Sequence, residues 1–168
     1  TTADFDYADN LTFSDHAVQK GIAALKSGCD IVTDTQMAKA GINKTILASL
    51  GGEVHCFMSD PDVAQEARSR GVTRAFVSME KAAALEKPCI FAIGNAPTAL
   101  LSLEQLMEEG KAAPALIIGV PVGFVNVEIS KERIIEKARA PYIVARGRKG
   151  GSNVAAAICN ALLYQIRR

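Results

Sequence analysis

The chain has 168 residues, of which 49% are hydrophobic and 22% are charged, and its formal net charge is +1. This composition is typical of one globular domain with a sizeable core, and the near-neutral balance gives no electrostatic reason to expect a nucleic-acid or membrane partner. No apolar run approaches the about 20 residues that a membrane-spanning helix needs.

Helices and short apolar runs alternate along the first half of the chain. A helical pattern at 14–28 has a capping serine, Ser14, at its start and a glycine at its end. Two apolar runs, at 31–33 and 54–58, follow it and predict buried strands. The next helix begins with Pro61 and stops at Gly71, since proline favours the first turn of a helix and glycine the position past its end.

The middle of the chain contains one ambiguous segment. Residues 76–77 form a weak apolar run, but the surrounding TRAFVSMEKAAAL reads more easily as a helix, so the predicted sheet has five or six strands. A clear strand follows at 89–93. Pro97 then opens a leucine-rich helix, and Gly110 lies past its end.

The last third continues the alternation. It contains an apolar run at 115–120, the short amphipathic helix SKERIIEKAR and another apolar run at 142–145. The final helix opens with Ser152 as its cap and ends with Arg167 and Arg168, which suit the negative end of the helix dipole. The opening residues, TTADFDYADNLTF, begin no obvious element, and we expect that an N-terminal segment is missing.

Alternating strands and helices indicate an α/β fold: a single domain with a mostly parallel sheet of five or six strands and helices on both faces. In such a sheet, ligands bind outside the carboxyl ends of the strands. Four strand-to-helix turns are therefore candidates for a site, and we expect them along one edge. They are DTQMAK (34–39), GNAPT (94–98), GVPVGF (119–124) and RGRKGGS (146–152).

These turns share a chemistry that favours anions. Their glycines let a ligand approach the backbone closely, and helix N-termini present unpaired N–H groups and a partial positive charge. RGRKGGS adds three cations, Arg146, Arg148 and Lys149. The simplest inference is a pocket for a polyanion, either carboxylate or phosphate; the alternative is that these are tight turns whose basic residues are merely solvated. A nucleotide site stays open only through RGRKGGS, because neither GxxxxGK[ST] nor GxGxxG is present.

Acid–base and metal-binding groups are scarce. His16 lies inside the first helical pattern and is interpreted as a surface histidine, whereas His55 lies in a strand-like run and is interpreted as a core or edge histidine. Asp34, at a strand end, is a candidate either for a site or for a helix cap. The four cysteines stand far apart without a CxxC pair, which predicts reduced core thiols in a cytoplasmic protein rather than a metal cluster or disulfides.

Together the four turns resemble a known family, the precorrin-8X methylmutases of cobalamin biosynthesis. The resemblance is carried by DTQMAKAGI, GVTRA, AIGNAPTALL, PALIIGVPVGFVNVEISKE and RGRKGGSNVAAAICNAL, in this order through nearly all of the chain. Each motif alone is weak, but the set at these separations is highly specific. Residues 1–168 thus resemble one methylmutase-like domain.

The resemblance implies an isomerase that carries out an intramolecular methyl transfer. Enzymes of this family move the methyl group of C-11 to C-12 on a ring-contracted tetrapyrrole and give hydrogenobyrinate, or cobyrinate when the substrate contains cobalt, without a separate cofactor. The acetate and propionate carboxylates of the substrate agree with a polyanion pocket. The family forms its active site at a homodimer interface, so the resemblance implies a cytoplasmic homodimer that binds a corrinoid.

The family's motifs assign substrate-binding residues to this chain. They are Arg74, Asn95, Thr98, Lys149, Gly150, Gly151 and Ser152, with Asp34 and Met37 as pocket-lining residues. These residues are expected to grip the carboxylates and orient the macrocycle, because a migrating methyl group needs the ring in one reactive geometry. Val120, Val122 and Phe124 either suit the flat apolar face of the ring or pack under the sheet edge.

The family's catalytic histidine has no match in this chain. The resemblance places it immediately before Thr1, so no catalytic residue is visible, and neither His16 nor His55 matches it. Two alternatives to the methylmutase stay open: a non-catalytic protein that binds a corrinoid or another tetrapyrrole, and a nucleotide-binding enzyme that uses GRKGGS. The lysine in GRKGGS leans slightly toward the cobalt-containing branch of the pathway, without deciding it.

Overall fold

The computed structural model describes residues 1–166, so the expected interaction of Arg167 and Arg168 with the helix dipole lies outside the described residues. The centre of this part of the chain is a sheet of six strands in the order β1-β6-β5-β4-β2-β3. The strands are β1 (Leu11–Phe13), β2 (Asp30–Thr33), β3 (Val54–His55), β4 (Cys89–Ile93), β5 (Leu116–Gly119) and β6 (Tyr142–Ala145). Every neighbouring pair is parallel except β1 with β6, which confirms the mostly parallel sheet.

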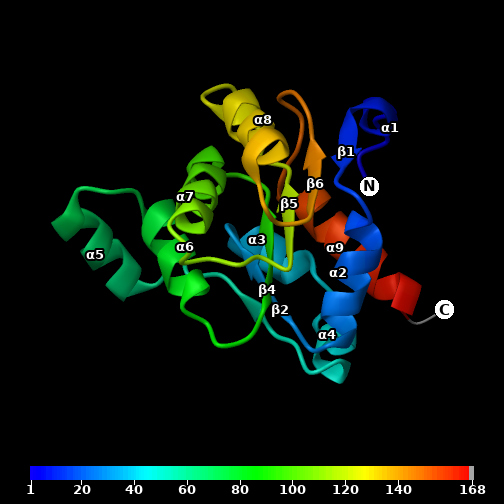
Figure 1. Cartoon of the computed structure of the whole chain (residues 1–168), viewed down its shortest axis with the longest axis horizontal. Coiled ribbons are helices and arrows are strands. Elements are labelled where there is room, and N and C mark those ends of the chain that lie inside the picture. Colours follow the sequence, from blue (N-terminus) through cyan, green and yellow to red (C-terminus); the bar gives the residue numbers. More distant parts are fainter. Residues whose placement is uncertain (167–168) are drawn as a thin grey trace.

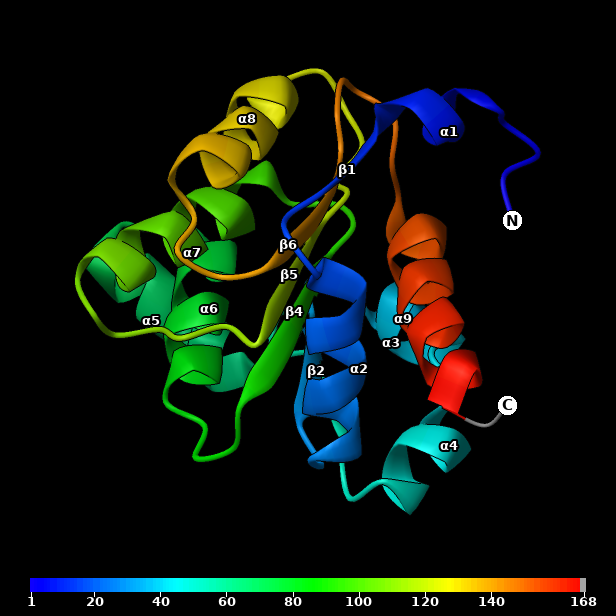
Figure 2. The same cartoon turned by 45° about the vertical axis from the view of Figure 1, so that its right-hand side comes forward.

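Helices cover both faces of the sheet, as Figure 2 shows. On one side lie α6 (Arg74–Ala83), α7 (Pro97–Glu108) and α8 (Val127–Lys137), and on the other lie α2 (Ala17–Lys26), α3 (Gln36–Gly41), α4 (Lys44–Ser49) and α9 (Ser152–Ile166). Beyond α6, α5 (Pro61–Arg70) projects at one end of the molecule, and the short α1 (Asp6–Asn10) lies beside β1 (Figure 1). This three-layer arrangement confirms the predicted α/β fold.

Two hydrophobic clusters fill the spaces between the sheet and its helices. Successive residues of a strand point to opposite faces, so β4 gives Ile90 to the cluster on the α2 and α9 side and Phe91 to the cluster on the α6 and α7 side. All residues of β2, β4 and β5 are buried, which is typical of a parallel sheet covered on both faces. A small third cluster of Val63, Ala67 and Val77 joins α5 to α6.

Proline and glycine set the helix ends as the sequence predicts. Pro61 and Pro97 begin α5 and α7. Past the ends of these helices, Gly71 (φ 65°) and Gly110 (φ 70°) adopt the left-handed conformation, which costs glycine little. The start of α9 differs slightly, because Ser152 is its first helical residue rather than its cap.

The first long helix starts later than its serine suggests. It begins at Ala17, and His16 (φ 57°) stands at the cap position without a side-chain cap. The Oγ of Ser14 instead accepts a hydrogen bond from the Tyr142 N–H (2.9 Å), so this serine ties the chain to the start of β6. The prediction of a Ser14 cap is therefore wrong, and His16 is an exposed residue just before the helix rather than inside it.

The predicted strands differ from the observed ones in three places. The apolar run at 54–58 forms only the two-residue β3, and residues 76–77 lie within α6, which confirms the helical reading of that segment. The sixth strand, β1, was not predicted. Its three residues pair with a strand far along the chain, Leu11 opposite Ala145 and Phe13 opposite Ile143, so the partner rather than the local pattern defines it.

All four cysteines are buried, and the described part of the chain contains no disulfide. Burial raises the pKa of Cys29 and Cys159 to about 12 and that of Cys89 to about 11, so these thiols stay protonated at neutral pH. Within residues 1–166 no helix is long and apolar enough to cross a membrane, and no group of three potential metal ligands occurs. The prediction that the four thiols lie in the core is confirmed.

Candidate functional site

The four predicted turns lie side by side at one edge of the sheet. The strands that precede them, β6, β5, β4 and β2, are consecutive parallel neighbours, so their carboxyl ends share that edge. Backbone hydrogen bonds join the turns directly: the Val120 N–H donates to the carbonyl of Ile93 (2.9 Å), and the Gly151 N–H donates to the carbonyl of Val120 (2.9 Å). The expectation of a single edge is confirmed.

Asp34 is an internal anion at this edge. It follows β2 and is only 2% exposed. One carboxylate oxygen accepts a hydrogen bond from the N–H of Gly94 (2.8 Å), and the other accepts from the N–H groups of Asn95 (2.8 Å) and Ala96 (2.6 Å). Three consecutive amide groups of GNAPT, at the start of α7, are therefore occupied by one side chain.

This arrangement corrects the picture of an open anion site at GNAPT. The amide groups that were expected to meet a ligand hold Asp34 instead. Burial raises the pKa of the Asp34 carboxyl, while the bonds from the backbone amides act in the opposite direction. Asp34 thus holds the neighbouring turn, whereas Thr35 is the side chain that caps the helix after β2, so the alternative of a helix cap is wrong for Asp34. Its role in lining a substrate pocket stays a prediction.

The start of α9 lies against the end of β4. A Cβ added to Gly94 would stand 2.7 Å from the Cα of Ser152 and 2.8 Å from the carbonyl oxygen of Gly151, which is too close for any other residue type. On the other side of Ser152, its Oγ lies 2.7 Å from the Oγ1 of Thr35. The GNAPT and RGRKGGS turns are therefore in direct backbone contact, and Ser152 sits between them and the turn after β2.

The three cations of RGRKGGS all have acidic partners. Lys149 Nζ lies 2.7 Å from Asp4 and 2.5 Å from Asp6, and hydrogen bonds to these carboxylates hold the Lys149 pKa well above its usual range. Two glutamates of α8 pair with the arginines of the turn, Glu128 with Arg148 (3.0 Å) and Glu132 with Arg146 (3.5 Å). All these pairs are partly exposed, so a polyanion can compete for the cations at little cost.

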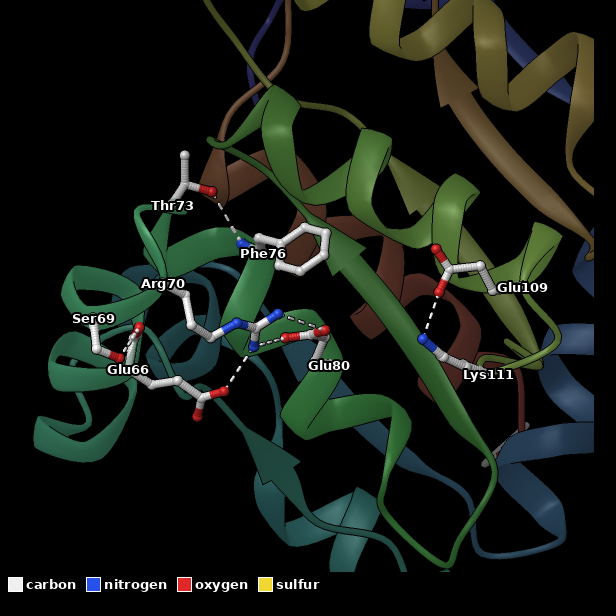
Figure 3. Close-up of polar contacts among 8 residues, drawn as sticks. All are labelled: Glu66, Ser69, Arg70, Thr73, Phe76, Glu80, Glu109 and Lys111. Carbon is white, nitrogen blue, oxygen red and sulfur yellow. Dashed lines mark hydrogen bonds and ion pairs between the residues drawn. The ribbon is translucent and has the colours of Figure 1, made fainter.

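Arg74 differs from these cations, because it has no ion pair within residues 1–166. It is exposed and is the first residue of α6, whose start is capped by Thr73: the Phe76 N–H donates to the Thr73 Oγ1 (3.1 Å), as Figure 3 shows. The nearby Arg70 is engaged, since it reaches from α5 to Glu80 of α6 and also bonds Glu66 (Figure 3). Arg74 is therefore free to bind an anion.

Thr98 lies close to the start of α6. A shallow groove of about 300 Å³ separates the first turns of α6 and α7, and Thr73, Phe76, Thr98 and Leu101 are among its lining residues. Asn95 is exposed in the turn before α7. The structure thus places Arg74, Asn95 and Thr98 on neighbouring helix starts at the same edge of the sheet.

Apolar side chains are exposed at this edge. Phe124 is 83% exposed and Val122 is 45% exposed, whereas Val120 is fully buried in the core. The Arg148 guanidinium lies 5.7 Å from the centre of the Phe124 ring. Met37, in the first turn of α3, is 70% exposed. Two of the three aliphatic and aromatic residues predicted to face a ring are therefore accessible, and Val120 packs under the sheet edge instead.

Neither histidine belongs to the four turns. Ser14, two residues before His16, contacts Tyr142 at the amino end of β6. His55 is the last residue of β3, and its Nε2 lies 3.0 Å from the Oδ2 of Asp30, the first residue of β2. This contact confirms the interpretation of His55 as a satisfied edge histidine.

Sequence reasoning missed Lys131, which lies fully buried in α8. The buried residues of this helix are Val127, Ser130, Lys131 and Ile134. Their spacing places them on the inward-facing side of an amphipathic helix. A lysine on that side was the sequence feature that could have revealed its burial. Burial lowers the pKa of Lys131 to about 8, against the opposing effect of Glu128 and Glu132.

Comparison with known proteins identifies the family. The model of the precorrin-8X methylmutase family matches residues 1–165. The chain belongs to this family. It is therefore a methylmutase, an isomerase of cobalamin biosynthesis, as the motifs at the sheet edge predict.

Relatives match the methylmutase over nearly its whole length. The cobalt-precorrin-8 methylmutase of Salmonella typhimurium is 49% identical over 168 residues, which cover 99% of this chain and 78% of that protein. The cobalt-precorrin-8 methylmutase of Priestia megaterium is 47% identical over 161 residues, covering 96% and 71%. The crystal structure of the precorrin-8X methylmutase from Thermus thermophilus agrees with a TM-score of 0.88 at 38% identity, covering 99% of this chain and 81% of that one.

Proposed function

We propose that this chain moves the methyl group of C-11 to C-12 of cobalt-precorrin-8 or precorrin-8X and gives cobyrinate or hydrogenobyrinate. The observation that carries the proposal is the meeting of four turns, each part of a family motif, at the carboxyl edge of one parallel sheet. The reaction is intramolecular, so no separate cofactor takes part. A site for it needs to hold one large ring in a fixed geometry.

The cobalt-containing substrate is the preferred candidate. The two relatives named for cobalt-precorrin-8 are 49% and 47% identical to this chain, whereas the solved structure named for precorrin-8X is 38% identical. Cobalt in this case belongs to the substrate and not to the protein.

The edge offers two kinds of surface for a corrinoid. Arg74 and Lys149 supply positive charge for the acetate and propionate groups, and Lys149 exchanges Asp4 and Asp6 for a substrate carboxylate. Val122 and Phe124 supply apolar contact for the face of the ring. Asn95, Thr98, Gly150, Gly151 and Ser152 complete the proposed binding set, with Met37 and Asp34 at its margin.

The proposal includes a cytoplasmic homodimer with the site at its interface. Support comes from the loop between β5 and α8, where Phe124 is 83% exposed, Val125 is 77% exposed and Ile129, on the first turns of α8, is 61% exposed. Exposed apolar side chains gathered on one segment are typical of interaction surfaces. A second copy that covers this segment also encloses the substrate.

The acid–base group of the reaction is proposed to be a histidine that precedes Thr1. Neither His16 nor His55 matches the family's histidine, and the resemblance to the family places the functional one upstream. The natural coding sequence before Thr1 tests this point, because absence of a histidine from the residues immediately upstream contradicts the family mechanism for this protein.

Titration with hydrogenobyrinate tests the proposed site. The methylmutase and a non-catalytic corrinoid-binding protein both retain this coloured ligand through gel filtration, and ATP in excess leaves it bound. A nucleotide-binding enzyme that uses GRKGGS instead binds ATP and does not retain hydrogenobyrinate. Failure to retain any corrinoid contradicts the proposal.

Arg74→Ala and Lys149→Ala are each expected to raise the Kd for hydrogenobyrinate about tenfold, because each removes a charged hydrogen-bond donor for a carboxylate. His16→Ala is the control: the exposed His16 lies away from the edge, and its loss is expected to change the Kd less than about twofold. Fluorescence or absorbance titration measures all three. Equal effects of the three substitutions contradict the assignment of the site.

A further inference from the structure

Lys131 lies beneath the RGRKGGS turn and is the one fully buried lysine among residues 1–166. Its ammonium donates hydrogen bonds to the carbonyl oxygens of Gly147 and Lys149, each at 2.8 Å. Burying an ammonium group is costly unless strong acceptors surround it. An apolar side chain at position 131 would avoid this cost, so the presence of a lysine there requires an explanation.

Two carbonyl groups of the turn point toward the buried Lys131, those of Gly147 and Lys149. Between them, the carbonyl of Arg148 accepts a hydrogen bond from the Gly123 N–H (3.2 Å). The backbone of the turn is therefore held from two elements, α8 and the loop after β5.

The amide groups of the same peptide units face the other way. All peptide bonds of the described chain are trans, and in a trans peptide the N–H points opposite to the C=O. The N–H groups of Arg148 and Gly150, which share peptide units with the carbonyls of Gly147 and Lys149, therefore turn away from Lys131, and neither has an acceptor within residues 1–166. Free amides held on the same side of a turn offer a positively polarised site for an anion.

The other links between α8 and the turn are weaker. Glu128 and Glu132, one helical turn apart on α8, pair with Arg148 and Arg146. These pairs are about half exposed, and exposed ion pairs contribute little to rigidity. The buried ammonium with its two short bonds is thus the contact of α8 that fixes the backbone of the turn.

We propose that Lys131 is a positioning residue, whose buried ammonium holds the carbonyl groups of Gly147 and Lys149 so that the amides of Arg148 and Gly150 bind a carboxylate of the substrate. The inference rests on the proposed function, because it takes the carboxylate to be one of the acetate or propionate groups of the corrinoid. Lys131 itself does not touch the substrate.

The charge of Lys131 changes in an accessible pH range. With its pKa lowered to about 8, the side chain is an ammonium at pH 7 and a neutral amine, a weaker donor, at pH 9.5. The charged groups around it are Glu128 and Glu132 on α8 and Arg146, Arg148 and Lys149 on the turn. Lys149, whose pKa is raised, stays charged over this range. Corrinoid binding is therefore expected to weaken as the pH rises from 7 to 9.5.

Lys131→Met tests the inference, with Lys137→Met as the matched control on the same helix. Lys137 contacts Glu104 and lies outside the site. We expect the Lys131→Met substitution to raise the Kd for hydrogenobyrinate, and the KM in turnover, about tenfold or more, with kcat changed less than about threefold. The variant also loses the weakening between pH 7 and pH 9.5. Lys137→Met retains the wild-type KM and pH profile.

Two further measurements keep the test decisive. Amide ¹⁵N relaxation of the ligand-free proteins is expected to show a turn at 147–150 that is more mobile in Lys131→Met and unchanged in Lys137→Met. If Lys131→Met does not fold, the pH profile of corrinoid binding by the wild-type protein tests the role of Lys131. A KM equal to wild type, or wild-type binding that is constant from pH 7 to 9.5, overturns the role of Lys131. Absence of corrinoid binding in the wild-type protein instead overturns the proposed function. In that case the ¹⁵N relaxation of residues 147–150 still tests whether Lys131 holds the turn.

Discussion

Asp34→Asn is expected to destabilise the chain by about 2–4 kcal/mol, because an amide cannot replace a carboxylate that accepts hydrogen bonds on both oxygens. In the wild-type chain these bonds come from the amides of Gly94, Asn95 and Ala96. The –NH₂ group of asparagine has to face at least one of these donors. Gly94 is buried, so an amide left there without an acceptor has no access to water.

Urea denaturation measures this loss, and Asp62→Asn provides the control. Asp62 is an exposed residue of α5 that pairs with Lys81, so its substitution is expected to cost less than about 1 kcal/mol. Because Asp34 also holds the GNAPT turn, which contacts the start of α9, the Asp34→Asn variant is expected to bind corrinoid more weakly. Equal stability of the two variants contradicts the role of Asp34 as the internal anion of the edge.

Gly150→Ala is expected to disrupt the RGRKGGS turn, with a cost of about 3 kcal/mol or more and a loss of corrinoid binding. A Cβ at this position would stand 2.1 Å from the carbonyl oxygen of Val120 and 2.9 Å from that of Pro121. Both are backbone atoms at the buried end of β5, so neither can move away as a flexible side chain would. The turn itself has to shift.

Gly71→Ala separates this steric effect from the general cost of replacing glycine. Gly71 has φ 65°, and no atom lies within 4 Å of its added Cβ. Its substitution therefore costs only the strain of an alanine in the left-handed conformation, about 1–2 kcal/mol. Its corrinoid binding is expected to match wild type. A Gly150→Ala protein with wild-type stability and wild-type binding contradicts the close contact between the turn and β5.

Much of the fold was predictable because its signals are local. The strands at 31–33 and 89–93 are continuous apolar runs, and Pro97 with Gly110 brackets α7. In contrast, β1 depends on pairing with β6, and the cap expected at Ser14 was lost to a hydrogen bond with Tyr142. These features follow from contacts between distant segments, which no local pattern contains.

The site was predictable in its location but not in its internal chemistry. Parallel topology alone places the turns at 94–98 and 146–152 on one edge. Two residues escaped the prediction because burial decides their roles. Asp34 looked available to a ligand, yet it satisfies the GNAPT amides, and Lys131 looked like one more charge in an amphipathic helix, yet it holds the turn from below.

Turnover of cobalt-precorrin-8 carrying ¹³C in its C-11 methyl group tests the central claim most directly. The native protein is expected to convert it to cobyrinate of unchanged mass, with the ¹³C resonance moved from the methyl group on C-11 to the methyl group on C-12. Substrate that is bound but retains its label at C-11 contradicts a methyl transfer by this protein.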